Sequence, residues 1–132
     1  MIKFLLLLIM IFLHIVDDYY LQGWLASAKQ KSWWEQNAPD KLYKYDYIMA
    51  LFMHSFSWSF MIMIVPSIFA LNRCFTSDIA FQIILTFICN LLIHMTTDNK
   101  KANLKEINLI QDQLIHLAQI IITWIYLIVI RL

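Results

Sequence analysis

The sequence predicts an all-α fold, an integral membrane bundle of four antiparallel helices with both termini on the same side. Of the 132 residues, 61% are hydrophobic and only 14% are charged, and the mean hydropathy is +0.66. These values exclude an ordinary soluble domain. A transmembrane helix needs about 20 predominantly apolar residues, and the chain contains four such windows. They cover residues 2–25, 46–72, 78–98 and 109–131 of a single transmembrane domain, 1–132.

The first window, residues 2–25, is expected to form a helix rather than a cleaved signal peptide. Its apolar core is interrupted by His14, Asp17 and Asp18, which a signal peptide would lack. His14, Asp18 and Gln22 follow one another at four-residue steps, so on a helix they share a face. Asp17 points about 100° away from Asp18 and is the weaker candidate for the interior.

The longest polar stretch, residues 27–45, follows the first window. It contains Trp33 and Trp34 among several lysines, and Pro39 prevents a long helix. Paired tryptophans with flanking lysines are typical of the lipid headgroup region. We therefore expect this stretch to be a loop that lies along the membrane surface.

Two further helices, 46–72 and 78–98, each carry one histidine. In the first of them His54 stands alone near the beginning of the window. The second ends in a ladder of polar side chains spaced four residues apart, Asn90, His94 and Asp98. Residues at this spacing lie one above another on a helix, so the ladder defines an inward face.

The last helix, 109–131, begins with an acid followed four residues later by an imidazole, Asp112 and His116. Gln119 continues the same stripe, and Gln113 lies beside Asp112. The rest of this window is apolar and is expected to face lipid or the helix core.

The order of the helices predicts that these polar side chains meet. If the four helices alternate in direction, the ends that carry the histidines and carboxylates all lie at one membrane surface. Seven of the ten basic residues fall in the two loops on that side, 27–45 and 99–108. By the positive-inside rule this side is cytoplasmic, and both termini lie opposite, as expected for a bacterial inner-membrane protein.

Three of the four histidines therefore have a carboxylate at helical spacing inside an apolar run. A carboxylate in a membrane is costly unless it is protonated, paired or bound to a metal. Histidine and aspartate together suit zinc first, with manganese or iron as alternatives, and one ion or two. The predicted ligands are His14, Asp18, His54, His94, Asp98, Asp112 and His116. The side chains expected to support these ligands are Gln22, Asn90, Gln113 and Gln119.

A buried metal centre of this kind would be able to support hydrolysis. A bound ion generates hydroxide from water and polarises a phosphoryl or acyl group. The substrate is expected to reach the site from the cytoplasmic face and to be a lipid, a lipid-linked headgroup or a phosphorylated metabolite. Asp18, Asp98 or Asp112 is the candidate general base. Lys100 and Lys101 are candidates to hold a substrate phosphate.

Two other functions fit the same residues. Chains of histidine and aspartate pass protons or divalent cations in transporters, although the far half of this bundle is almost entirely apolar. Alternatively, the polar layer is purely structural in a non-enzymatic membrane partner, because interhelical polar contacts contribute about 0.6–2 kcal/mol in membranes. Membrane lipids are the expected surroundings in every case, and the oligomeric state stays open.

Several classes are disfavoured. The net charge of +1 and the absence of a basic stripe argue against nucleic-acid binding. The zinc-protease motif His-Glu-x-x-His is absent, which disfavours proteolysis. The two cysteines, Cys74 and Cys89, lack the spacing of a zinc motif.

The histidine motifs also resemble those of a known family. Residues 14–22 (HIVDDYYLQ), the isolated His54, residues 94–98 (HMTTD) and residues 112–116 (DQLIH) are similar to a pattern found in small uncharacterised four-helix membrane proteins of bacteria and phages. That pattern reads His-x-x-x-Asp-Phe-x-x-Gln, His-x-x-x-Asp and Asp-Gln-x-x-His, and here Tyr19 replaces the phenylalanine. The resemblance implies that these residues act together but implies no reaction. A looser similarity to membrane-bound metal-dependent hydrolases implies hydrolysis.

Overall fold

The computed structural model describes residues 1–73 and 75–132, and these residues form α-helices and turns without a strand. Cys74, in the expected turn between the second and third windows, lies outside the described residues. Four segments are long and apolar enough to cross a membrane. They are Ile2–Leu21, Lys41–Arg73, Ser77–Leu104 and Leu109–Arg131. The prediction of four long apolar helices is confirmed.

Each of these segments is built around one long helix. Helix α1 covers Ile2–Ile15 and continues as a wider π-helical turn to Leu21, and α4 covers Asp46–Arg73. Helix α5 covers Ser77–Asn99 and continues to Leu104, and α6 covers Leu109–Thr123 and continues to Arg131.

Two of the predicted helix ends are wrong. The first helix ends at Leu21 rather than residue 25, because Gly23 has a φ of 49°. A positive φ takes the backbone out of the right-handed helix at little cost for glycine. The third helix continues through the predicted loop to Leu104 and ends at Lys105, whose φ is 58°. Loop 99–108 is therefore largely helical.

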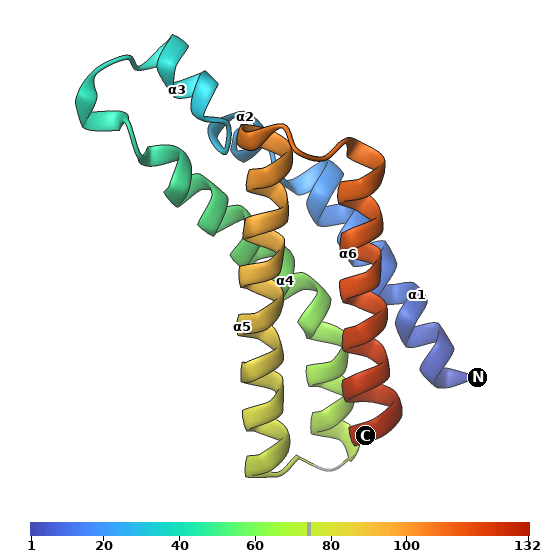
Figure 1. Ribbon diagram of the computed structural model, residues 1–132. Coiled ribbons are helices and arrows are strands. Elements are labelled where there is room, and N and C mark those ends of the chain that lie inside the picture. The colour runs from blue at the N-terminus through green and yellow to red at the C-terminus, as the bar shows by residue number, and fades with distance from the viewer. Residues whose placement is uncertain (74) are drawn as a thin grey trace.

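Helices α2 (Leu25–Ala28) and α3 (Lys31–Asn37) occupy the first half of the predicted surface loop, and a single 3₁₀ turn follows at Lys41–Tyr43. Figure 1 shows this region projecting from one end of the long helices. Trp33 and Trp34 pack edge to face, with ring centroids 5.0 Å apart, and the Trp34 indole donates a hydrogen bond to the carbonyl of Ala28. The hydrogen bond from Trp34 to Ala28 therefore ties α3 to the end of α2.

The four long helices contact one another in a closed circuit. Helix α4 packs against α1 and α5, and α6 packs against α1 and α5. In Figure 1 the chain reverses direction from α4 to α5 and again from α5 to α6. Both termini lie toward the end opposite α2 and α3.

The start of α6 is fixed by a capping box. The Asn108 side chain accepts a hydrogen bond from the Gln111 amide, and the Gln111 side chain accepts one from the Asn108 amide. This reciprocal pair satisfies two backbone donors that a helix start leaves free. It also sets the register of the polar stripe, because Asp112 and His116 follow within the first two turns.

The interior and exterior of the molecule have unusual polarity. Phe12, Ile84 and Ile122 are exposed, whereas His94 and Asp112 have no exposed surface. A soluble protein would show the opposite distribution. The apolar part of the core, around Met10, Trp58, Ile62 and Ile120, lies under this polar layer and continues toward the termini. The helices thus surround a polar interior with an apolar outer surface.

Candidate metal centre

The four long helices bring the predicted site residues together. Helix α1 and its continuation carry His14 and Asp18, α4 carries His54, α5 carries His94 and Asp98, and α6 carries Asp112 and His116. All four histidines, Asp98 and Asp112 are at most 2% exposed. Residues about a hundred positions apart in the sequence therefore share one buried layer, and no long connecting segment is needed to bring them together.

The Nε2 atom of His54 lies at the centre of this layer. It is 3.1 Å from Nε2 of His94, 3.2 Å from an Asp98 oxygen and 3.4 Å from an Asp18 oxygen. An imidazole nitrogen carries at most one proton, so hydrogen bonding from His54 satisfies at most one of these three contacts. The remaining contacts lack a hydrogen bond from this nitrogen, and a further proton or a cation among these atoms would satisfy them.

Nε2 of His116 also has more close contacts than one hydrogen bond can satisfy. The protonation of this ring follows from the contacts of its other nitrogen, Nδ1. The Gln119 amide nitrogen donates to the carbonyl of Asn90, which directs the Gln119 oxygen toward Nδ1 of His116 at 3.2 Å. Nδ1 must therefore carry the proton. In the neutral ring Nε2 then presents a lone pair to oxygens of Asp98 and Asp112, each 3.3 Å away. Two carboxylate oxygens and a lone pair meet at one point.

Two overlapping groups of these atoms have the spacing of metal ligands. One is Asp18, His54 and His94, and the other is His94, Asp98 and His116, with the ligand atoms of each group within 4.8 Å of one another. Around a tetrahedral zinc ion with bonds of about 2.0–2.1 Å, ligand atoms lie about 3.3–3.4 Å apart. The measured separations of 3.1–3.4 Å at His54 agree with that geometry. The residues present therefore fit one or two divalent ions.

His14 has a different role from the predicted one. The Trp58 indole donates to its Nδ1 at 2.7 Å, so its Nε2 carries the proton and donates to the Gln113 oxygen at 3.1 Å. Both ring nitrogens are used, and His14 belongs to neither ligand group. It holds Gln113 in place instead of presenting a lone pair to an ion.

The Gln113 side chain bridges the carboxylates of Asp18 and Asp112. Its amide nitrogen donates to Asp18 at 2.9 Å and to Asp112 at 3.1 Å, while Gln22 donates to the other Asp18 oxygen at 2.7 Å. Such contacts orient carboxylates toward a metal. Gln22 and Gln113, predicted as supporting residues, thus touch candidate ligands, and Asn90 does so indirectly through Gln119.

Two lysines enter the layer from the α2 and α3 end. Lys29, which follows α2, is buried and lies 2.5 Å from an Asp98 oxygen, and Lys101 lies 2.6 Å from an Asp112 oxygen. Lys100 and Lys101 were predicted as candidates to hold a substrate phosphate. Lys101 reaches this layer, whereas Lys100 is exposed. Lys29 was not singled out from the sequence, because its stretch was assigned to a surface loop.

Trp58 and Asp17 complete the layer. Trp58 lies one helical turn after His54 and stacks on His94, with ring centroids 4.2 Å apart. Its position four residues after a histidine was the only signal in the sequence. Asp17, the weaker candidate for the interior, is 1% exposed and accepts a hydrogen bond from Ser57 at 2.6 Å. Its second oxygen has no hydrogen-bond partner among the described residues.

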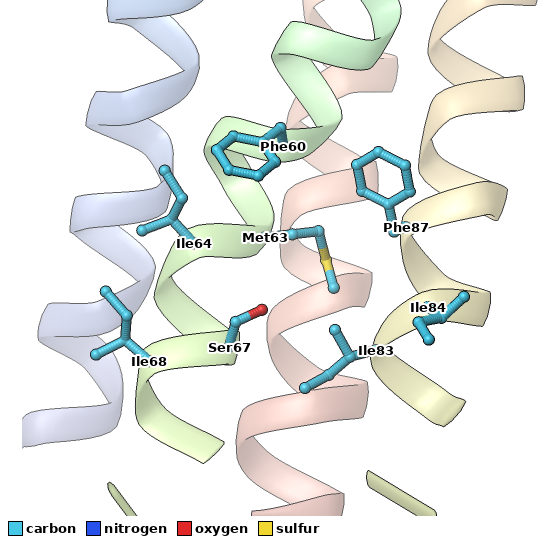
Figure 2. A pocket seen from close by; sticks show the side chains of 8 residues that line it. All are labelled: Phe60, Met63, Ile64, Ser67, Ile68, Ile83, Ile84 and Phe87. Atoms are coloured by element: carbon cyan, nitrogen blue, oxygen red, sulfur yellow. The ribbon is translucent and has the colours of Figure 1, made fainter. Parts of the chain in front are cut away.

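A polar pocket opens onto this layer. It has a volume of about 330 Å³, and its wall includes Asp18, Gln22, Lys29, Lys101 and Gln113. A second pocket of about 430 Å³ lies between α4 and α5 and is lined almost entirely by apolar side chains. Figure 2 shows its wall, in which the hydroxyl of Ser67 is the one polar side-chain group drawn. Of these two pockets, only the polar one is lined by titratable groups.

Comparison of the chain with protein-family models, with curated proteins and with solved structures found no match. The resemblance of the histidine motifs to a membrane-protein family therefore stays a prediction.

Proposed function

We propose that the protein is an integral membrane, antiparallel four-helix bundle with a buried divalent metal centre that hydrolyses a lipid, lipid-linked or phosphorylated substrate. The apolar outer surface and the four long apolar helices support insertion into a membrane. The proposal includes the predicted family resemblance, with both termini on one side and the polar pocket on the cytoplasmic side. Zinc is the first choice of ion, with manganese or iron as alternatives.

The observation that carries the metal centre is the fixed protonation of His116. In the neutral ring its Nε2 lone pair would face two carboxylates, so a positive charge belongs at that point, either a second ring proton or, as we propose, a metal ion. The whole layer has the same imbalance, because the buried carboxylates of Asp17, Asp98 and Asp112 and the partly buried carboxylate of Asp18 are accompanied by the two ammonium groups of Lys29 and Lys101. One divalent cation cancels the formal excess of two negative charges.

The roles of the side chains follow from their contacts. His54, His94 and His116 supply ring nitrogens to the ion, with Asp18 and Asp98 as carboxylate ligands. When bound, the ion makes a water molecule a nucleophile at neutral pH and polarises a phosphoryl or acyl oxygen.

Asp112 is the best placed general base. It belongs to neither ligand group, and Lys101 and Gln113 hold one of its oxygens. Its other oxygen is buried beside His116 and makes no hydrogen bond to the described residues. That oxygen faces the same point beside His116 as the Asp98 oxygen, so it can accept a proton from the attacking water when Asp98 and His116 hold the ion.

Elemental analysis of the detergent-purified protein tests this proposal. We expect close to one or two equivalents of zinc, manganese or iron in the wild type and their loss in the His94→Ala/His116→Ala variant. His14→Gln serves as the control, because this variant removes a histidine outside both ligand groups, and it should keep its metal. Circular dichroism and size exclusion show whether each variant folds. A folded wild type that takes up no metal, even after reconstitution, would contradict the proposal.

Transport of protons or cations is the second candidate, and one observation favours it. The network continues from His116 through Gln119 to Asn90, which donates to Thr123 at 2.8 Å. It thus extends from the site toward the far end of the helices. No hydrogen bond within the described residues connects Thr123 to the next polar pair, Tyr126 and Gln82. Metal-dependent flux into liposomes that His94→Ala abolishes would favour transport over hydrolysis.

A further inference from the structure

The polar pocket is lined by an unusual number of hydrogen-bond donors. Three lysines, Lys29, Lys101 and Lys105, line it together with the amide groups of three glutamines, Gln22, Gln30 and Gln113. Only one carboxylate, Asp18, belongs to the wall. Ammonium groups are donors without acceptor capacity, so a ligand that satisfies this wall must be rich in acceptors and negatively charged.

The lysines differ in how they are neutralised. Lys29 and Lys101 form ion pairs with Asp98 and Asp112, the carboxylates of the metal layer. Lys105 makes no ion pair with the described residues and ends the long helical segment in a left-handed conformation. Lys105 is therefore the one lysine of the wall without an ion pair among the described residues.

A divalent ion in the layer changes the charge of the pocket. The carboxylates that now neutralise Lys29 and Lys101 would be shared with the ion, which adds two positive charges behind the pocket wall. With the ion bound, the ion, Lys29 and Lys101 together balance the four carboxylates, and Lys105 adds one positive charge. The site then favours an anion over a neutral ligand, and a phosphate can divide its negative charge between the lysines and the ion.

We propose that this pocket binds the phosphate of a phosphate monoester, with Lys29, Lys101 and Lys105 as its charged partners. This inference rests on the proposed metal centre and names the substrate class of the same site. A monoester phosphate has three terminal oxygens and about two negative charges, which matches the three lysines and the amide donors of the wall. Because Asp18 is in both the pocket wall and a ligand group, a phosphate held there lies next to the ion.

The position of the pocket allows the ester to come from a lipid or from a soluble metabolite. Its wall includes Tyr19 and Leu109, which are both exposed near the ends of apolar segments. At that level a lipid phosphate lies in the headgroup layer, and a soluble phosphate reaches the same pocket from water.

Binding of radiolabelled orthophosphate to the metal-treated full chain in phosphatidylcholine nanodiscs tests the pocket. Equilibrium dialysis compares the wild type with Lys105→Gln and Lys100→Gln. We expect Lys105→Gln to weaken binding about tenfold or more. Lys100→Gln makes the same change in charge on the same segment, but Lys100 is exposed and outside the pocket, so it should keep wild-type affinity. No saturable binding to the wild type, or equal weakening in both variants, would overturn the proposal.

The same samples separate the two proposals, because their metal content is measured first. A metal-loaded protein that does not bind orthophosphate overturns the phosphate pocket and leaves the metal centre in place. A protein that takes up no metal overturns the proposed function, and orthophosphate binding that still depends on Lys105 then supports the pocket by itself. Phosphatidic acid in the nanodiscs identifies the source of the ester. Tenfold weaker orthophosphate binding indicates a lipid phosphate, and unchanged binding indicates a soluble one.

Discussion

At the scale of single residues, the central feature is a histidine whose protonation is dictated from outside the ligand group. Gln119 can present only its oxygen to His116, because its nitrogen donates to the backbone carbonyl of Asn90. A metal-bound histidine usually donates its other ring proton to such an acceptor, which fixes both the tautomer and the ring orientation. Gln119 was predicted as a supporting residue, and its contact with His116 gives that prediction a physical basis.

Removal of this acceptor should weaken metal binding without unfolding the protein. We expect Gln119→Leu to lower metal affinity about 10–100-fold, because Nδ1 of His116 then loses its acceptor and Nε2 is free to hold the proton. Competition with a fluorescent chelator measures the affinity. Thr123→Val is the control, since Thr123 ends the same network two contacts farther from the ring. Equal affinity of Gln119→Leu and the wild type would show that Gln119 only packs.

Lys29 offers a second test at this scale, because its ammonium group and a metal ion neutralise the same carboxylate. Without metal, Lys29→Met leaves Asp98 buried and unpaired, and removal of one partner of a buried ion pair costs about 3–5 kcal/mol. With metal, the ion compensates Asp98. We expect the variant to lose thermal stability in chelator and to recover most of it with metal.

Thermal unfolding in detergent, with chelator and with added zinc or manganese, measures this difference. Lys31→Met is the matched control, because Lys31 is half exposed and its partner Glu35 is more exposed still. Its stability should change little in either condition. An equal loss of thermal stability in Lys29→Met with and without metal would mean that no ion neutralises Asp98.

At the scale of helices, long apolar runs in the sequence predicted the four long helices. The exact helix ends were missed, because they depend on the backbone conformation of single residues. Four apolar windows gave the four long helices, because their length alone matches a membrane span. The spacing of histidine and aspartate gave the buried cluster. The spacing could not reveal that both ring nitrogens of His14 form hydrogen bonds, one with Trp58 and one with Gln113. Nor could it reveal that α2 brings Lys29 back to Asp98 to form an ion pair. Those contacts require the tertiary structure.

Gly23 allows the chain to turn so that Lys29 reaches Asp98, and its replacement should lower the stability of the protein. A Cβ at this position would meet its nearest atom, the Leu21 carbonyl oxygen, at 4.0 Å, so space is available and the cost lies in the φ of 49°. We expect Gly23→Ala to lower the free energy of unfolding by about 1 kcal/mol. Gly23→Asn should lower it less, because asparagine tolerates this conformation better. Denaturant unfolding in detergent measures both, and a fully stable Gly23→Ala would contradict the assigned backbone.

At the scale of the whole molecule, the distribution of side chains inverts that of a soluble protein. Charged and imidazole groups occupy the interior at one end, and isoleucine, leucine and phenylalanine cover the outside. The proposed membrane insertion would suit this arrangement, because acyl chains would then surround the outer side chains while the polar groups stay paired inside. Most lysines lie at the end that carries the polar pocket, which supports a cytoplasmic position for that end.

The proposed orientation predicts which residues are accessible from outside the cell. In a background with Cys74 and Cys89 replaced by alanine, Lys100→Cys tests the pocket end and Asn72→Cys tests the opposite end, since Lys100 and Asn72 are both exposed. A membrane-impermeant maleimide added to intact spheroplasts should label Asn72→Cys. It should label Lys100→Cys only after the membrane is disrupted, because the proposed orientation places the lysine-rich end in the cytoplasm. The reverse pattern would place the pocket outside the cell and require a substrate from that side, whereas labelling of both variants in intact spheroplasts would contradict a protein that spans the membrane in one orientation.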